Sequence, residues 1–281
     1  MDRLKLKKEL QSFLLEDIGH GDITSQAIFP MGEQGEGVFV AKQTGTIAGL
    51  DIIQEAYQLL DPSIQVALKC ADGETVTKGQ VIAEVQGHVA LLLTGERVIL
   101  NLLQRMSGIA TMTKSAVLAL HDDRITICDT RKTTPGLRML EKYAVTVGGG
   151  KNHRMGLYDG VMIKDNHIAF SGSITKAVQS VREKTGHMVQ IEVETETKEE
   201  VLEAVDAGAD IIMFDNCPPE VVKAFSTYVP DHIITEASGG IELDNLSAYA
   251  GTNVDYISLG FLTHSVQALD ISMNVKHAHY L

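Results

Sequence analysis

The sequence predicts an α/β protein that combines an N-terminal α/β sandwich domain with an open, incomplete β/α barrel. Two observations support this prediction. Short strand patterns alternate with helices over about the first 120 residues, and a regular repeat of strand, loop and helix follows from about residue 124. With 44% hydrophobic and 22% charged residues, the 281-residue chain has the composition of an ordinary globular protein.

The first region begins with a helix and continues with strands. Apolar residues at helical spacing predict a helix over 3–16, and a second helix is expected over 50–60. Alternating apolar and polar residues predict strands over 37–41 and 63–68. Helices packed on a sheet of this kind form an α/β sandwich.

A glycine-turned hairpin is expected over 71–85, and a long helix over 89–120 follows it. The hairpin resembles the repeat of biotinyl and lipoyl carrier domains. Its turn has no Met-Lys-Met sequence, so a carrier role is not favoured. Gly108 is expected to break the long helix.

Six strands are predicted in the second region. Amphipathic helices such as 197–208 separate them, and the last three intervals between strand centres are all about 22 residues. This spacing favours β/α units that curve into a barrel, and the number of strands leaves that barrel incomplete. The predicted strands are 125–128, 161–163, 188–193, 211–214, 233–235 and 256–258.

Polar residues or glycines follow these strands at the points where the strands end. The carboxyl ends of the strands of a β/α barrel meet on one face, and barrel enzymes build their active sites there. The chain is therefore predicted to be an enzyme. The residues at the strand ends are Asp129, Arg131, Lys132, Lys164, Glu194, Asp215, Ser238, Gly239 and Gly260.

Cations gather at the first two of these strand ends. Residues 129–167 contain seven Lys or Arg and four acids, although the whole chain has a formal net charge of −13. Unpaired buried cations are costly, so several in one site imply a ligand with several negative groups. The acidic remainder of the chain offers no broad basic face for nucleic acid, and a small polyanion is expected. The expected cationic side chains are Arg131, Lys132, His153, Arg154 and Lys164.

The later strand ends bear carboxylates and glycines. Glu194 and Asp215 follow consecutive strands and are suited to hold ribose hydroxyls or Mg²⁺. Glu192 shares a strand with Glu194, and both a role in the site and a simple pairing with a nearby cation are open for it. Glycine-bearing loops at 238–240 and 258–260 are suited to hold a phosphate through backbone N–H groups.

Other kinds of site and location are not supported. Cys70, Cys128 and Cys217 form no CxxC pair and suit buried thiols in a reducing cytoplasm. His264 and the terminal HxH at 277–279 form no metal-ligand set. The N-terminus is charged and no apolar run is long enough to span a bilayer, so a cytoplasmic protein is expected.

Nine segments resemble signatures of the quinolinate phosphoribosyltransferase family, also called nicotinate-nucleotide pyrophosphorylase (carboxylating). The resemblance covers nearly the whole chain from Glu16 onward. The segments are 16–24, 95–111, 129–136, 151–159, 163–167, 192–194, 215–216, 237–240 and 260–265.

The resemblance implies a fold of the type II phosphoribosyltransferase kind. It also implies transfer of the phosphoribosyl group from 5-phosphoribosyl-1-pyrophosphate (PRPP) to quinolinate, with Mg²⁺ as cofactor. The products are nicotinate mononucleotide, pyrophosphate and CO₂, in de novo NAD biosynthesis. The implied assembly is a homodimer with shared active sites, and further assembly into a hexamer is left open.

The resemblance further implies a role for each site residue. Arg97 is expected to reach quinolinate from the partner chain, and the other residues expected to bind quinolinate are Arg131, His153, Arg154 and Lys164. The residues expected to bind PRPP are Lys132, Glu194, Asp215, Ser238, Gly239 and Gly260, and Glu194 and Asp215 also meet the metal. Catalytic roles are expected for Lys132, Lys164, Glu194 and Asp215.

The expected domains are 1–110, joined by 266–281, and a barrel over 111–265. The nearest alternative is a paralogue of the molybdenum-transport type with a different phosphoribosyl acceptor, which the intact cationic set disfavours. A β/α-barrel phosphosugar isomerase would explain the loop at 238–240 but not the cations. A non-catalytic ligand-binding or carrier protein would need neither cations nor carboxylates at successive strand ends.

Overall fold

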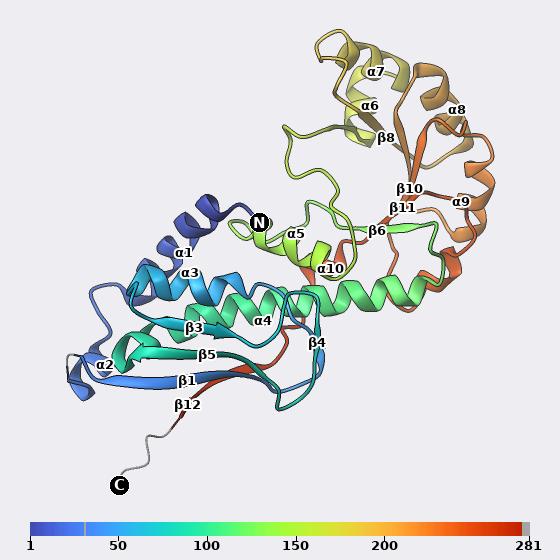
Figure 1. Ribbon diagram of the computed structural model, residues 1–281. Helices are drawn as coiled ribbons and strands as arrows, with labels where there is room; N and C mark the ends of the chain where they lie inside the picture. Colours follow the sequence, from blue (N-terminus) through green and yellow to red (C-terminus); the bar gives the residue numbers. More distant parts are fainter. Residues whose placement is uncertain (31, 277–281) are drawn as a thin grey trace. The chain divides into compact units, whose positions relative to one another are not determined.

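The computed structural model describes residues 1–30 and 32–276, and the chain divides into two compact units (Figure 1). Unit 1 comprises Met1–Met112, Met139–Gly148 and the segment from Val266 onward. Unit 2 comprises Thr113–Arg138 and Gly149–Ser265. The terminal HxH at 277–279 lies outside the described residues.

Unit 1 is built on a four-stranded antiparallel sheet with the order β12-β1-β5-β3. Helix α1 buries Leu6, Leu10 and Leu14, which repeat every four residues and therefore lie on one helix face. The strands are β1 (Gln34–Ala41), β3 (Gln65–Leu68), β5 (Val81–His88) and β12 (Ile271–Lys276). The helices are α1 (Arg3–Ile18), α2 (Ile23–Ile28), α3 (Asp51–Leu60) and α4 (Val89–Leu120), and α4 continues into unit 2.

Helix α5 (Arg138–Val147) belongs almost entirely to unit 1, although the sequence placed this segment in the barrel. Two contacts hold it there. The guanidinium of Arg105 donates to the fully buried carboxylate of Glu141 at 2.6 Å, and the hydroxyl of Tyr143 donates to Asp72 at 2.8 Å. Both partners are distant in sequence, so periodicity alone could not assign the helix.

The predicted hairpin over 71–85 is wrong. Strand β4 (Thr75–Val76) pairs with β2 (Gly45–Thr46), whereas β5 pairs with β1 and β3. Gly73 and Gly79 have φ angles of +91° and +88°, so the chain turns sharply on each side of β4. These two turns direct β4 to a separate two-stranded pairing.

The predicted break at Gly108 is also wrong, because α4 is continuous from Val89 to Leu120. A Cβ atom at Gly108 would lie 2.1 Å from the backbone oxygen of Gln267. Glycine therefore allows the segment that leads into β12 to pass directly against the helix.

Unit 2 contains a six-stranded parallel sheet with the order β6-β11-β10-β9-β8-β7. Within the described residues, β6 and β7 are the two ends of the sheet and do not pair with each other, which confirms the predicted incomplete barrel. The strands are β6 (Thr126–Cys128), β7 (Val161–Ile163), β8 (Ile191–Thr195), β9 (Ile211–Asp215), β10 (Ile234–Ser238) and β11 (Tyr256–Ser258).

Helices connect these strands in the order expected for β/α units. Helix α8 begins at a capping box in which Thr197 and Glu200 exchange hydrogen bonds, and it ends at Gly208 in the left-handed region. Local signals of this kind are why the sequence located this helix well. The helices are α6 (Asp165–Ser171), α7 (Ile174–Arg182), α8 (Lys198–Ala207), α9 (Pro219–Ser226), η1 (Leu246–Tyr249) and α10 (Phe261–His264).

Cys128 and Cys217 are buried and Cys70 is half-buried. In the part of the chain that the structure describes, no helix combines the length and apolar character needed to cross a membrane.

Candidate active site

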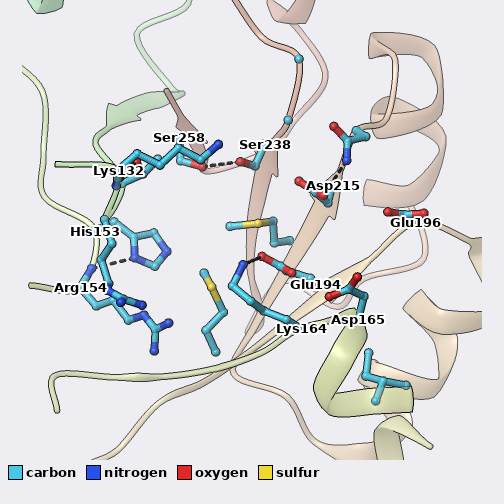
Figure 2. Close-up of a pocket in the computed structure, with 18 of the residues that line it drawn as sticks. Lys132, His153, Arg154, Lys164, Asp165, Glu194, Glu196, Asp215, Ser238 and Ser258 are labelled. Atoms are coloured by element: carbon cyan, nitrogen blue, oxygen red, sulfur yellow. Dashed lines mark hydrogen bonds and ion pairs between the residues drawn. The ribbon is translucent and has the colours of Figure 1, made fainter. Parts of the chain in front are cut away.

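A cavity of about 780 Å³ lies at the carboxyl ends of the parallel strands of unit 2 (Figure 2). Nine of the eleven residues to which the family resemblance assigns a role line it. The strand ends therefore bring together side chains that are more than 100 residues apart in sequence. These nine residues are Arg131, Lys132, His153, Arg154, Lys164, Glu194, Asp215, Ser238 and Gly239.

The other two predicted residues do not line this cavity. Gly260 lies beside it, and a Cβ atom there would come within 3.0 Å of the Lys132 side chain. Arg97 is an exposed residue of α4 in unit 1, and its guanidinium has no ion-pair partner among the described residues.

The cavity has a cationic side and an acidic side. Figure 2 shows Lys132, His153 and Arg154 on one side, and Glu194 and Asp215 facing them from the other. The Nε atom of Arg131 is buried and has no hydrogen-bond partner in the described part of the chain. A buried guanidinium donor without a partner is costly, and an anion in the cavity would satisfy it.

Arg154 is held in place by its own loop. One guanidinium nitrogen donates to the backbone oxygen of Gly160 at 2.8 Å. Burial lowers the pKa of Arg154, and the neighbouring positive charge of Arg131 lowers it further. Two guanidinium groups that repel each other in one site favour a ligand with more than one negative group.

His153 lines the cavity, but both of its ring nitrogens face groups of the protein. Its Nδ1 atom accepts the backbone N–H of Arg154 at 2.7 Å, and Nε2 lies 3.0 Å from Oε2 of Glu192. The backbone N–H of His153 donates to the fully buried carboxylate of Asp129 at 2.9 Å. Among the described residues, Glu192 thus contacts His153, which lines the cavity, and not a lysine or arginine.

The acidic side is formed at the ends of β8 and β9. Glu194 pairs with the ammonium group of Lys164. Burial raises the pKa of Glu194, and Lys164 opposes this rise. Asp215 accepts a hydrogen bond at 2.7 Å from the side-chain amide of Asn216, which lines the same cavity. Both carboxylates have the hard oxygen atoms that Mg²⁺ prefers.

The glycine loops complete the rim. Gly239 has a φ of +82°, and a Cβ atom there would lie 2.3 Å from the side chain of Asn216. The hydroxyl of Ser258 donates to that of Ser238 at 2.9 Å, which joins the ends of β10 and β11. The loop backbone therefore lies close to the cavity, as binding of a phosphate requires.

Both parts of the chain match domains of one family. The sequence profile of the quinolinate phosphoribosyl transferase N-terminal domain matches residues 22–107, and that of the C-terminal domain matches residues 109–274. The chain belongs to the quinolinate phosphoribosyltransferase family.

Individual relatives agree with this assignment. A Bacillus subtilis (strain 168) protein named probable nicotinate-nucleotide pyrophosphorylase (carboxylating) is 62% identical over 276 residues, 98% of this chain and 95% of the relative. A Nicotiana glauca quinolinate phosphoribosyltransferase (decarboxylating) is 42% identical over 96% of this chain and 82% of the relative. The crystal structure of NadC from Streptococcus pyogenes superimposes with a TM-score of 0.95 at 42% identity, covering 98% of both chains.

The site of this quinolinate phosphoribosyltransferase family member includes residues that sequence reasoning missed. Two sulfur-bearing side chains, Met162 and Met213, lie on strands and line the cavity. Their inward direction would have followed from strand alternation once the exact ends of the strands were known. The missed acids that line the cavity are Asp165, Glu196 and Glu200.

Proposed function

We propose that the large cavity of unit 2 is the active site at which this chain transfers the phosphoribosyl group of PRPP to quinolinate and releases CO₂, in NAD biosynthesis. The observation that supports this site most strongly is the division of one cavity into a cationic and an acidic side. Quinolinate brings two carboxylates and PRPP brings several phosphate charges. A neutral substrate would leave the buried guanidinium nitrogen of Arg131 without a partner.

Quinolinate binds on the cationic side. Arg131 and Arg154 take its carboxylates, and a guanidinium can do so through two parallel hydrogen bonds. His153 completes this subsite on the same side, and Lys164, which pairs with Glu194 on the acidic side, faces it across the cavity (Figure 2). Arg97 of the partner subunit supplies a further guanidinium from outside.

PRPP binds between the acidic side and the glycine loops. Glu194 and Asp215 meet the ribose hydroxyls. The backbone of Ser238, Gly239 and Gly260 holds the 5′-phosphate, and Lys132 lies beside Gly260 where a phosphate charge would meet it.

Mg²⁺ is the cofactor that the acidic side fits. Glu194 and Asp215 would hold it, directly or through water and substrate oxygens, and it would neutralise the charge of the departing pyrophosphate. Because Glu194 pairs with Lys164 in this structure, the two cations would share that carboxylate when both are present.

The chain's own residues favour the transition state by electrostatics. Breaking the bond between ribose and pyrophosphate leaves positive charge on the sugar ring, which the carboxylates of Glu194 and Asp215 stabilise. Bond formation with the pyridine nitrogen gives a pyridinium ring. When CO₂ departs from carbon 2, the bonding electron pair stays at that carbon, where the adjacent positive ring nitrogen stabilises it, and a proton from water completes nicotinate mononucleotide, so the step needs no organic cofactor. Lys132 and Lys164 stabilise the negative groups throughout.

We propose a homodimer as the active form, because a complete acceptor subsite takes Arg97 from a second copy; a hexamer would be a trimer of such dimers. The expected location is the cytoplasm, where PRPP is available.

Purified protein with quinolinate, PRPP and Mg²⁺ is expected to release one CO₂ for each nicotinate mononucleotide formed. The assay follows CO₂ from carboxyl-labelled quinolinate and the nucleotide by chromatography. Chelation of the metal should stop turnover, and added Mg²⁺ should restore it. Turnover with nicotinate but none with quinolinate would contradict the proposal.

Gly239→Ala is expected to destabilise unit 2 by about 3 kcal/mol and to raise the KM for PRPP, because its Cβ would meet the side chain and backbone nitrogen of Asn216. Gly240→Ala is the matched control. Gly240 also has a positive φ, of +64°, but no atom lies within 4 Å of its Cβ position, so only the strain of about 1–2 kcal/mol remains. Thermal unfolding and PRPP kinetics compare the two variants, and equal effects would show that the loop tolerates a side chain at Gly239.

A further inference from the structure

A cluster of three ionisable side chains lies inside the barrel of unit 2. The Nε2 atom of His153 is 3.0 Å from Oε2 of Glu192 and 3.7 Å from Oε1 of Glu236. The side chains of Glu192 and Glu236 are only 3% and 6% exposed. The reaction described above uses neither carboxylate, so their presence beside a substrate-binding residue needs its own explanation.

The two glutamates line a second cavity, of about 320 Å³, near the amino ends of the strands. His153 and Arg154 line both this cavity and the large one. The Oε1 atoms of Glu192 and Glu236 are buried and have no hydrogen-bond partner among the described residues. A purely structural network would satisfy these oxygens, because buried polar atoms without partners are costly.

A metal ion is one occupant that the cluster could suggest, since one ligand atom from each residue lies within 4.8 Å of the others. The hydrogen bonds of His153 argue against it. A histidine bound to a metal donates its second ring N–H to an acceptor. Here Nδ1 accepts the backbone N–H of Arg154, so the ring proton lies on Nε2 and points at the carboxylates. The cluster is thus a hydrogen-bond donor, His153, whose proton points at Glu192 and lies near Glu236.

Glu192 also acts on Arg154, because its negative charge opposes the lowering of the Arg154 pKa by burial and by Arg131. His153 and Arg154 are thus engaged by carboxylates of the protein, and carboxylate is the group that quinolinate would present to them. On the basis of the function proposed above, we propose that Glu192 and Glu236 form an internal counter-anion of the quinolinate subsite. Glu192 accepts the Nε2–H of His153 and balances Arg154, Glu236 adds a second carboxyl group 3.7 Å from the same nitrogen, and quinolinate competes with them for these cationic and donor groups.

This competition makes binding of quinolinate depend on pH. Burial, followed by the charge of Glu192, raises the pKa of Glu236 to about 8. The groups facing Glu236 are Glu192 from β8, His153 from the loop before β7, Asp129 from the end of β6 and Ser258 from β11. Below its pKa, Glu236 is neutral and does not repel quinolinate. Above it, a second carboxylate opposes the incoming dianion, so the KM for quinolinate should rise between about pH 7 and pH 9.

Glu192→Gln tests the counter-anion directly, because glutamine keeps an acceptor for His153 and removes the charge. We expect the KM for quinolinate, at saturating PRPP, to fall about threefold to tenfold with kcat within about twofold. A role in merely holding the fold would raise this KM instead. The sign of the change therefore separates the two explanations.

Glu236→Gln is the second, independent variant, since glutamine imitates the protonated carboxyl group. Its KM for quinolinate should stay level between about pH 7 and pH 9, where that of the unsubstituted protein rises. Glu55→Gln is the control, because Glu55 is a buried glutamate of unit 1 that is only 7% exposed. It should leave both the KM and its pH dependence unchanged.

A raised KM in Glu192→Gln, or a retained rise with pH in Glu236→Gln, would overturn the inference and leave the proposed function intact. Failure of the unsubstituted protein to turn over quinolinate would instead overturn the proposed function, and the inference with it. The two failures are therefore distinguishable in one set of assays.

Discussion

Arg131→Ala is expected to lower kcat/KM for quinolinate roughly 100- to 1000-fold, as truncation of a buried charge that pairs with a ligand costs several kcal/mol. Arg131 lines the cavity, and its Nε atom is buried without a partner. The substrate carboxylate would thus lose two parallel hydrogen bonds at a place that water cannot easily fill. The decrease should affect quinolinate, the phosphoribosyl acceptor, and the KM for PRPP should change by less than about threefold.

Steady-state kinetics with each substrate varied in turn measure this effect. Arg131→Lys should show an intermediate loss, because lysine keeps the charge but not the planar pair of donors. Arg124→Ala is the control. Arg124 belongs to the same unit, but its side chain is 70% exposed and pairs with Asp122. Unchanged kinetics in Arg131→Ala would remove this residue from the site.

The strands of unit 2 were predictable because each is a short apolar run that ends in a polar residue or glycine. All six predicted strands overlap observed ones, and no contact between distant residues is needed to recognise them. The main difference is at β8, which starts at Ile191 and extends to Thr195. Glu194 therefore lies within the strand, and the pairing with β9 continues past it to Thr195, whose side chain is buried.

The features that the sequence did not predict depend on contacts between distant residues. A glycine within a helical pattern usually indicates a helix break. At Gly108 the helix continues, and the position requires glycine because the backbone of Gln267 passes too close for a side chain. The placement of α5 depends on partners at Arg105 and Asp72. Glu236 lies one residue beyond the strand predicted over 233–235, and its burial beside His153 depends on the pairing of β8, β9 and β10.

The position of Arg97 leads to the second large effect. Arg97 belongs to unit 1, is exposed, and is absent from the cavity that the other acceptor residues line. If it completes the acceptor subsite of a second copy, Arg97→Ala and Lys164→Ala should each abolish activity, for different reasons. The first variant would lack the borrowed guanidinium, and the second would lack a cation of its own site.

Mixing these two inactive variants should restore roughly a quarter of the wild-type activity. Random pairing makes about half of the dimers mixed, and one of the two sites in each mixed dimer would contain both Arg97 and Lys164. The measurement needs dissociation, remixing and confirmation of mixed dimers by differently tagged chains.

A mixture of Arg131→Ala with Lys164→Ala is the matched control for that experiment. Both residues line the cavity of one chain, so every site in a mixed dimer would lack one of them and activity should stay absent. Recovery in both mixtures would point to exchange or contamination. No recovery in verified mixed dimers of Arg97→Ala and Lys164→Ala would mean that each chain completes its own site. Recovery in that mixture alone is the outcome expected if an exposed arginine of unit 1 serves the cavity of a neighbouring chain.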